Sequence, residues 1–224
     1  MQALAVEPLG VDPPVWPLHG VRLTTADLGL TVTVESDLAT LARVLPDDVE
    51  QDPEATTYAG LDVVANRHAV LAQAYWRALG TWSPRDWALP FTVHRDGAVV
   101  GMQWLESTET GEGGVVDSSS WLVPEARGRG WGRQMRAAVL SLAFGPLGAR
   151  AAVSSAVLAN GASLGVSRAL GYENTHRSVL EHSGEVLQHL RLERVAWEAS
   201  RAGDPVTVHG VDLAVLALFG IEEA

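Results

Sequence analysis

The most constraining feature of the sequence is a loop of alternating glycines between an apolar run and an amphipathic segment. The apolar run ends at Trp121 to Val123, the loop carries Gly128, Gly130 and Gly132, and Arg133 to Phe144 has apolar residues at helical spacing. Glycine leaves the backbone amides uncovered, and at a helix start those amides converge with the positive end of the helix dipole. The stretch therefore predicts a strand, a loop and a helix that together form an anion site.

The residues around this loop favour a pyrophosphate as the anion. Arg127, Arg129 and Arg133 add full positive charge beside the glycines. No Lys-Ser or Lys-Thr pair follows Gly132, so nothing would reach the terminal phosphates of ATP or GTP. The spacing is GxGxG instead of the dinucleotide GxGxxG, and no acidic residue follows at the distance needed to bind a ribose hydroxyl. Both common nucleotide loops are excluded.

Two motifs carry a family resemblance. Arg127, Gly130 and Gly132 match the pattern [Q/R]-x-x-G-x-[G/A], which is the acyl-CoA-binding motif of the GCN5-related N-acetyltransferase (GNAT) superfamily. The stretch from Asn160 to Tyr172 is similar to the second signature of that superfamily, N-x-x-[A/S] followed by a helix that ends in L-G-[F/Y]. The chain most resembles the branch that includes the ribosomal-protein alanine N-acetyltransferases.

The resemblance implies a mixed α/β fold with a mostly antiparallel central sheet, helices on both faces, and a splayed pair of parallel strands that holds CoA. Local signals agree with it. Asp96-Gly97 between two apolar runs predicts a hairpin. Gly145-Pro146 ends the helix that follows the loop. A strand at 149–157 would then follow a helical crossover, and so lie parallel to the strand at 115–123.

The expected domain organisation is one acyltransferase domain with two extensions. Residues 1–20 are rich in proline and are expected to form an N-terminal arm, and residues 21–199 the domain. Residues 200–224 are expected to be a C-terminal tail, packed on the domain or on a partner chain. Trp82 and Trp87 would either wall the acceptor pocket or be ordinary core rings.

Composition limits the compartment and the partners. The chain has no cysteine, which excludes disulfides and thiolate chemistry and suits a cytoplasmic location. It shows no signal peptide and no apolar stretch long enough to span a bilayer, so no membrane is expected. The formal net charge is −11, which disfavours nucleic acid as a partner. The histidines show no metal-ligand spacing, and no metal is expected.

The resemblance also implies how acyl-CoA, the co-substrate, would be bound. Backbone amides of Leu122 and Val123 would hold the thioester carbonyl and the pantetheine. The loop residues Arg127, Gly128, Arg129, Gly130, Trp131 and Gly132 would bind the pyrophosphate. Asn160 and Ser163, at the start of the second signature helix, complete the expected coenzyme site.

Amide formation requires a proton for the departing thiolate. Many superfamily members carry tyrosine seven residues after the asparagine, but this chain has Ser167 there. Ser163 is therefore the preferred candidate, either as the acid or as a hydrogen-bond partner of the sulfur, unless its hydroxyl only caps its own helix. Tyr172 is the alternative hydroxyl.

For the base that receives the proton of the amine, Glu106 and Asp117 are the carboxylates expected nearest the mouth of the pocket, at the ends of adjacent strands. A water relay would replace them if both are solvated loop residues.

The predicted function is an acyl-CoA-dependent N-acyltransferase that acts on a primary amine of a protein N-terminus or a small molecule. Acetyl is the default acyl group, succinyl or a longer group is the alternative, and a homodimer is the assembly considered. The alternative is a non-catalytic acyl-CoA-binding module.

Overall fold

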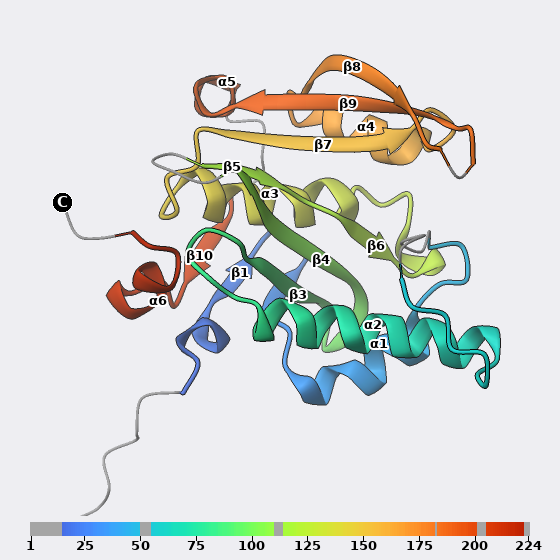
Figure 1. Ribbon diagram of the computed structural model, residues 1–224. Coiled ribbons are helices and arrows are strands. Elements are labelled where there is room, and N and C mark those ends of the chain that lie inside the picture. Colours follow the sequence, from blue (N-terminus) through green and yellow to red (C-terminus); the bar gives the residue numbers. More distant parts are fainter. Residues whose placement is uncertain (1–14, 50–54, 110–113, 182, 201–204, 222–224) are drawn as a thin grey trace, which may run out of the picture.

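The spine of the structure is an antiparallel hairpin of β3 (Ala88–Arg95) and β4 (Ala98–Glu109) at the centre of one mixed sheet. The structure is a computed structural model that describes residues 15–49, 55–109, 114–181, 183–200 and 205–221 (Figure 1). Asp96 and Gly97 have φ angles of 48° and 80°, as a two-residue turn with both positions left-handed requires. The predicted Asp-Gly hairpin is confirmed.

The sheet order is β10-β1-β2-β3-β4-β5-β7-β9-β8, and β6 also pairs with β4. Neighbours are antiparallel except for β5 and β7. The remaining strands are β1 (Arg22–Thr24), β2 (Gly29–Val32), β5 (Val115–Asp117), β6 (Ser120–Leu122), β7 (Ala151–Val157), β8 (Glu173–Val179), β9 (Val186–Glu193) and β10 (Thr207–His209). Only one strand was expected within 21–34, but both apolar runs there are strands, joined as a hairpin.

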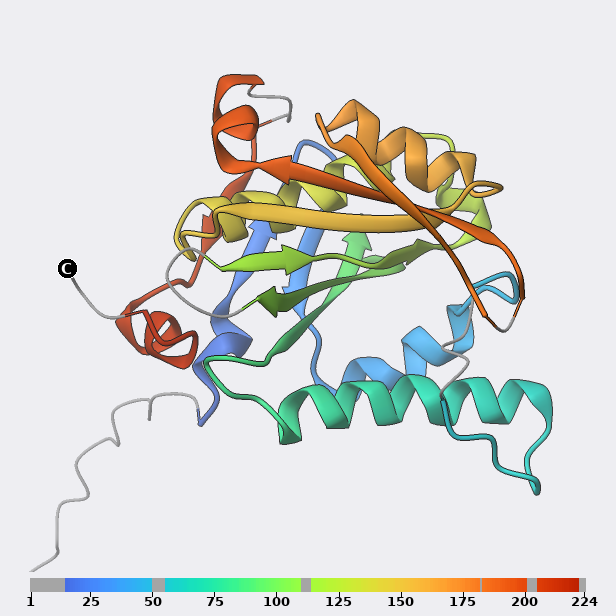
Figure 2. The same cartoon turned by 45° about the horizontal axis from the view of Figure 1, so that its top comes forward.

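Helices cover both faces of this sheet (Figure 2). On one face, α1 packs on β4 and α2 packs on β3; on the other, α3 packs on β1, β4 and β6, and α4 packs on β7. The two remaining α-helices, α5 and α6, follow β9 and β10. The helices are α1 (Leu38–Val44), α2 (Val63–Gly80), α3 (Trp131–Phe144), α4 (Gly161–Ala169), α5 (Arg194–Ser200) and α6 (Leu213–Leu218), with short 3-10 turns η1 (Pro17–Gly20), η2 (Glu35–Asp37) and η3 (Pro124–Ala126). No described helix is long and apolar enough to cross a membrane.

The main core lies between the sheet and α3. Nearly the whole of α3 after its first turn is buried, and Val116 of β5 and Leu105 of β4 belong to the same cluster of apolar side chains. Successive residues of a strand point to opposite faces. Val116 therefore defines the α3 face of the sheet, and its neighbours Val115 and Asp117 point to the face covered by α1 and α2.

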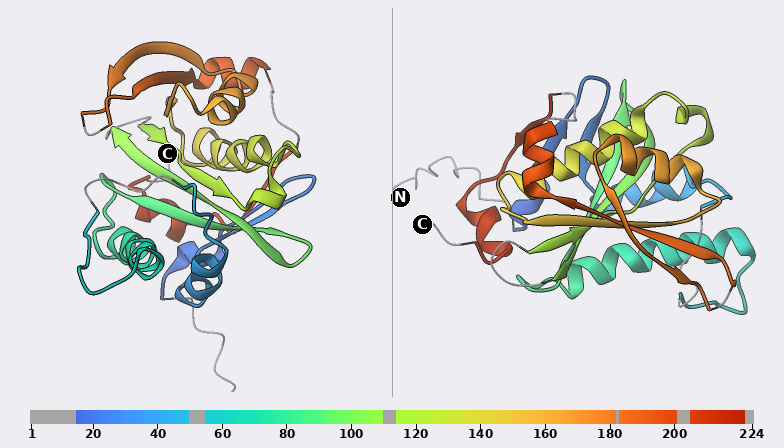
Figure 3. Two further views of the ribbon diagram at one scale, coloured as in Figure 1. Left: turned by 90° about the vertical axis from the view of Figure 1, so that its right-hand side faces the viewer. Right: turned by 90° about the horizontal axis from the view of Figure 1, so that it is seen from above.

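The parallel pair separates after two residue pairs. Val115 pairs with Ala151 and Val116 with Ala152, after which the chain of β6 stays with β4 while β7 pairs with β9. The gap opens toward the loop before α3, as the views from the side and from above show (Figure 3). The splayed strands implied by the family resemblance are present.

Segments from both ends of the chain complete the side of the sheet remote from this gap. β10 pairs with β1, and Phe219, directly after α6, lies edge-on against Trp82 and Trp87 at centroid distances of 5.3 and 4.8 Å. Leu18 of η1 is fully buried, so the last part of the expected N-terminal arm belongs to the core. Residues 1–14, 201–204 and 222–224 of the expected arm and tail lie outside the described residues. Trp82 and Trp87 are core rings of this cluster.

Candidate active site

The predicted anion loop lies at the start of α3, at the open end of the strand gap. Gly130 is the residue before the helix and has φ of 80°, a left-handed conformation that a side chain disfavours. The amides of Arg133 and Gln134 both donate to the Gly130 carbonyl, so intrahelical bonding begins there. The amides of Trp131 and Gly132, the first two residues of α3, precede this ladder and are free of intrahelical acceptors. The loop therefore has the geometry of an anion site.

The side chain of Arg127 has a different position from the one its charge suggested. Its two terminal nitrogens form a bidentate ion pair with Asp48, at 2.5 and 2.7 Å, and Nε donates to the Leu122 carbonyl at 3.0 Å. The pKa of Asp48 is lowered by this hydrogen bond from Arg127. Arg127 thus ties the segment after α1 to the end of β6 and shapes the loop from outside.

Trp131 lies between two guanidinium groups. The Cζ atoms of Arg95 and Arg129 are 5.3 and 5.5 Å from its ring centroid, within cation–π range. The first turn of α3 is also fixed by Gln134, whose amide donates to Asp27 and whose carbonyl oxygen accepts from Thr25. The turn between β1 and β2 therefore holds the start of the helix.

The alternation of hydrogen bonds along β6 decides which amides face the gap. The Val123 amide donates to the Val100 carbonyl at 2.9 Å, and the Ser119 carbonyl accepts from the Trp104 amide at 2.8 Å. Amides of successive residues point to opposite sides of a strand. Those of Leu122 and Ser120 therefore point into the gap, away from β4. The role of the Leu122 amide in binding acyl-CoA stays a prediction. The Val123 amide is used within the sheet, and the amide that faces the gap beside that of Leu122 belongs to Ser120.

Gly101 allows β6 to lie where it does. A Cβ atom at this position would lie 2.3 Å from the Trp121 carbonyl oxygen, which real side chains do not tolerate. Gly101 faces Leu122 in the register, so the close approach of the two backbones occurs beside the residue whose amide faces the gap. The sequence showed this residue only as a glycine inside a strand, a signal for close backbone approach.

Glu106 and Asp117 are directly opposite each other in the register of β4 and β5. Opposite residues share a face, which here is the α1/α2 face. Burial raises the pKa of Glu106 first, and the charge of Asp117 raises it further, while a hydrogen bond from Ser119 lowers it. Burial also raises the pKa of Asp117, while a hydrogen bond from the Ser118 amide and the charge of Arg136 lower it. The two predicted carboxylates thus form a pair at the closed end of the gap.

The hydroxyls proposed as acids lie in two different environments. Ser163 is half-buried in the first turn of α4, where Asn160 accepts a hydrogen bond from its amide at 3.0 Å. Ser167 is buried, accepts from Arg136 at 2.6 Å and donates to the Ser163 carbonyl. Tyr172 is buried, and desolvation raises the pKa of its phenol strongly. Ser163 is the hydroxyl of the three that retains access to solvent.

Comparison with known proteins agrees with this geometry. The family model of the acetyltransferase (GNAT) domain matches residues 27–173. The chain belongs to the GNAT acetyltransferase family.

Solved structures of acetyltransferases share its fold at low sequence identity. Mycobacterium smegmatis RimJ in complex with CoA-disulfide has 16% identity and a TM-score of 0.61, and the match covers 79% of this chain and 88% of the RimJ chain. Salmonella typhimurium YncA, a putative acetyltransferase, with acetyl-CoA has 19% identity and a TM-score of 0.53, covering 75% and 94%. Aminoglycoside acetyltransferase AAC(6')-Ib with coenzyme A and kanamycin has 17% identity and a TM-score of 0.59, covering 78% and 99%.

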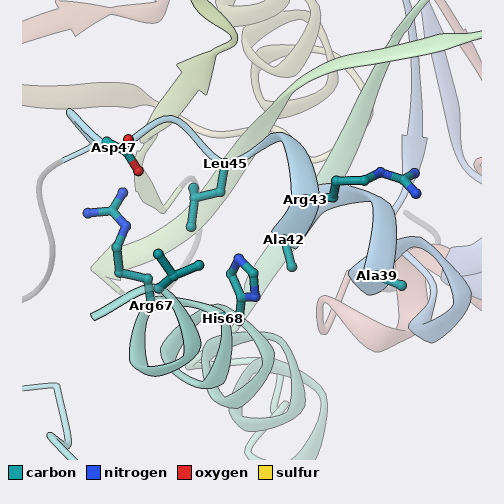
Figure 4. A pocket seen from close by; sticks show the side chains of 8 residues that line it. Ala39, Ala42, Arg43, Leu45, Asp47, Arg67 and His68 are labelled. Atoms are coloured by element: carbon teal, nitrogen blue, oxygen red, sulfur yellow. The ribbon is translucent and has the colours of Figure 1, made fainter. Parts of the chain in front are cut away.

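In this GNAT chain a pocket of about 460 Å³ lies between α1 and α2, on the face of the sheet that carries the carboxylate pair. Asp47 and Arg67 point toward each other at one end of it, and His68 points into the space between the helices (Figure 4). Ala42 and Leu45 supply its apolar wall. His68 is half-buried and lines this pocket. Among the described residues no group of three His, Asp or Glu side chains could hold a metal ion.

Proposed function

We propose that this protein is an acyl-CoA-dependent N-acyltransferase, with acetyl-CoA as a donor, that modifies a primary amine of a protein N-terminus or a small molecule. The observation that carries the proposal is the carboxylate pair of Glu106 and Asp117, placed across β4 and β5 beside the point where β5 and β7 separate. An acyltransferase needs a base at this point and an anion site at the other end of the gap. The chain has both.

The residues present fit coenzyme A. The left-handed Gly130 and the first amides of α3 suit a pyrophosphate, and the amides of Ser120 and Leu122 suit the amide and thioester carbonyls of the pantetheine arm. A Cβ atom at Gly132 would lie 3.5 Å from the Val166 side chain, an ordinary van der Waals contact, so α4 borders the loop on this side. Bound acyl-CoA would supply an acyl group activated as a thioester; all other steps fall to the residues of this chain.

The carboxylate pair supplies the base. A primary amine reaches a protein site mainly as an ammonium ion, which must lose a proton before it can attack a carbonyl carbon. A carboxylate whose pKa is raised accepts that proton more readily at neutral pH than an exposed one. Glu106 has two causes of a raised pKa, burial and the neighbouring charge, and Ser119 lies beside it on the same face. We assign Glu106 as the base and Asp117 as the residue that tunes it.

Ser163 supplies the other proton. Its amide is fixed by Asn160, so the hydroxyl sits at the start of α4, on the side of the gap opposite β6. A hydroxyl there can donate to a departing thiolate and recover its proton from water. Tyr172 is too deeply buried for this exchange. The acceptor would approach from the α1/α2 face, where the pocket beside Asp47 and His68 lies.

The test measures CoA release from acetyl-CoA with a panel of amines that includes peptides with free N-termini, polyamines and aminoglycosides. Glu106→Gln should lower kcat by about 10²- to 10⁴-fold, the usual size for a lost general base. Asp117→Asn should shift the pH profile of kcat/KM more than it lowers the maximal rate. A change below about threefold in both variants would refute the assignment and favour a water relay. Tight acetyl-CoA binding without transfer to any amine would instead support the binding-module alternative.

A further inference from the structure

Arg136 is a buried cation in the middle of α3, with only 4% of its surface exposed. Its guanidinium Nη1 donates to two hydroxyls, Ser167 Oγ at 2.6 Å and Ser154 Oγ at 3.4 Å. Within the described part of the chain no carboxylate forms an ion pair with it, and Asp117 acts on it only at longer range. A guanidinium keeps its charge under all ordinary conditions. Buried charges normally have a charged partner.

Unpaired donors gather around this cation. Nε of Arg136, Oγ of Ser118 and the phenol oxygen of Tyr172 are buried atoms without a hydrogen-bond partner among the described residues. Ser118 lies within hydrogen-bond reach of the Tyr172 phenol and, like the charge of Arg136, lowers the pKa of that phenol. One hydrogen bond between these two hydroxyls still leaves one of their donors over, beside the unpaired Nε of Arg136, and buried donors are almost always paired. Each of the three can donate a hydrogen bond, and an anion would satisfy them together.

These donors lie at the apex of the gap between β5 and β7. Ser118 and Ser154 each follow the last parallel pair, Val116 and Ala152, by two residues. Alternation along the strands places both serine side chains on the α3 face, where Arg136 lies. The site is therefore at the closed end of the same gap whose amide donors, on Ser120 and Leu122, would hold a thioester.

The spacing sets the length of the ligand. At a rise of about 3.3 Å per residue, Ser118 lies roughly 7 Å from Ser120 and roughly 13 Å from Leu122 along the strand. An acetyl group ends at its methyl carbon and would not reach the apex. An acyl chain with a second carboxylate about two to four carbon atoms beyond the thioester would bring that carboxylate within hydrogen-bond distance of the guanidinium.

We propose that the apex formed by Arg136, Ser118 and Tyr172 is a subsite for the terminal carboxylate of a dicarboxylic acyl-CoA, such as succinyl-CoA, and that the protein prefers this class of donor to neutral donors of the same length. The proposal rests on the acyltransferase function above. In the reaction, the amine nitrogen attacks the thioester carbon, the carbon–sulfur bond breaks, the thiolate receives a proton and the amine loses one. The second carboxylate takes no part in these steps and only fixes the acyl chain.

The test compares three donors with one verified amine: succinyl-CoA, butyryl-CoA of the same chain length without the charge, and acetyl-CoA. The native protein should use succinyl-CoA with a kcat/KM at least about tenfold above that for butyryl-CoA. Arg136→Met keeps the length and apolar stem of the side chain. This substitution should lower the ratio of kcat/KM for succinyl-CoA to kcat/KM for butyryl-CoA by roughly 10- to 100-fold. Arg22→Met, an exposed arginine on β1, is the control and should leave the ratio unchanged.

Binding measurements separate failure of this proposal from failure of the proposed function. Calorimetry with a non-hydrolysable succinyl-CoA thioether and its butyryl counterpart reads the subsite without any turnover. Equal affinity of the native protein for both would overturn the subsite, even if acetyl transfer is efficient. A preference for the succinyl analogue that is lost in Arg136→Met would support the subsite, even if no amine is acylated. If Arg136→Met fails to fold, Ser118→Ala replaces it, and its succinyl-to-butyryl ratio should fall by at least about threefold.

Discussion

Glu106 and Asp117 face each other across the β4–β5 register, and both carboxyl groups have raised pKa values. The ordinary values are 4.5 and 3.8, and burial is the first cause at each position. Two buried acids opposite each other on one face of a sheet are a costly arrangement for folding. The two acids lie beside the point where β5 and β7 separate.

The stability of the protein should therefore depend on pH through this pair. A raised folded-state pKa means that the native state keeps its proton where the unfolded chain has lost it. The contribution to stability is complete below the ordinary pKa values and is lost as the pH rises through the raised ones. Chemical denaturation should show that Glu106→Gln gains stability relative to the native protein as the pH rises from about 4 to about 8. A constant difference across that range would contradict the raised pKa.

Gly130→Val should abolish coenzyme binding in a protein that still folds. A side chain in the left-handed conformation costs about 1–2 kcal/mol, and a branched one also covers the amides of the loop. Isothermal titration with CoA measures the effect. Gly29→Val is the matched control, because Gly29 lies in β2 with open space around its Cβ position, and its affinity should match that of the native protein. Unchanged CoA affinity in folded Gly130→Val would refute the loop assignment.

Arg127→Ala should weaken CoA binding less than Gly130→Val does. The guanidinium is engaged with Asp48 and the Leu122 carbonyl, so its loss loosens the loop without removing the amides that face the anion. We expect a fall in affinity of roughly tenfold or less, as for a single displaced contact. Asp48→Ala should produce most of the same fall, and the double variant little more. Strictly additive losses in this cycle would show that Arg127 contacts the coenzyme directly.

Ser163→Ala and Ser167→Ala should have different effects. Ser163→Ala should lower kcat with little change in the affinity for acetyl-CoA, because its contact with the sulfur forms chiefly in the transition state. Ser167→Ala removes the short hydrogen bond of buried Arg136 and should lower the free energy of unfolding by roughly 1.5–3 kcal/mol. From the sequence alone Ser167→Ala was expected to do little. Thermal unfolding beside steady-state kinetics separates the two effects, and full turnover in Ser163→Ala would exclude it as the acid.

His189 of the outer hairpin should lose its proton at a lower pH than an ordinary histidine does. The rings of His176 and His189 stack at 4.2 Å, and partial burial followed by the charge of His176 lowers the pKa of His189 below its ordinary 6.5. Histidine NMR should show His189 losing its proton at a lower pH than a free imidazole. His176→Gln should raise the pKa of His189. If the pKa of His189 in the native protein is at or above 6.5, the stacking has no electrostatic effect.

The sequence predicts those parts of the site that depend on local backbone geometry. The Asp-Gly hairpin, the Asn160 cap and the glycine before α3 are each specified by one or two residues whose backbone preferences are strong. The pairing of Glu106 with Asp117 also follows once the strands are placed, since both residues lie near strand ends.

Four features depend on contacts between distant segments and were missed. Asp48 as partner of Arg127, and Gln134 as anchor of the β1–β2 turn, join residues that no short pattern relates. The buried position of Arg136 runs against the usual exposure of arginine, and nothing in its neighbourhood of the sequence marks it. The choice between the Val123 and Ser120 amides is set by the strand register, which fixes the direction of every second donor.

The pairing of β1 with β10 has a consequence for how the protein is made. Thr24 lies opposite Thr207, so β1 is paired by a strand that is far from it along the sequence. Synthesis proceeds from the N-terminus, so this side of β1 stays unpaired until β10 has emerged from the ribosome. Phe219, whose ring contacts Trp82 and Trp87, is synthesised after β10. Contacts of such long sequence separation form slowly, so the pairing of β1 with β10, and not the folding of β3 and β4, completes this side of the sheet.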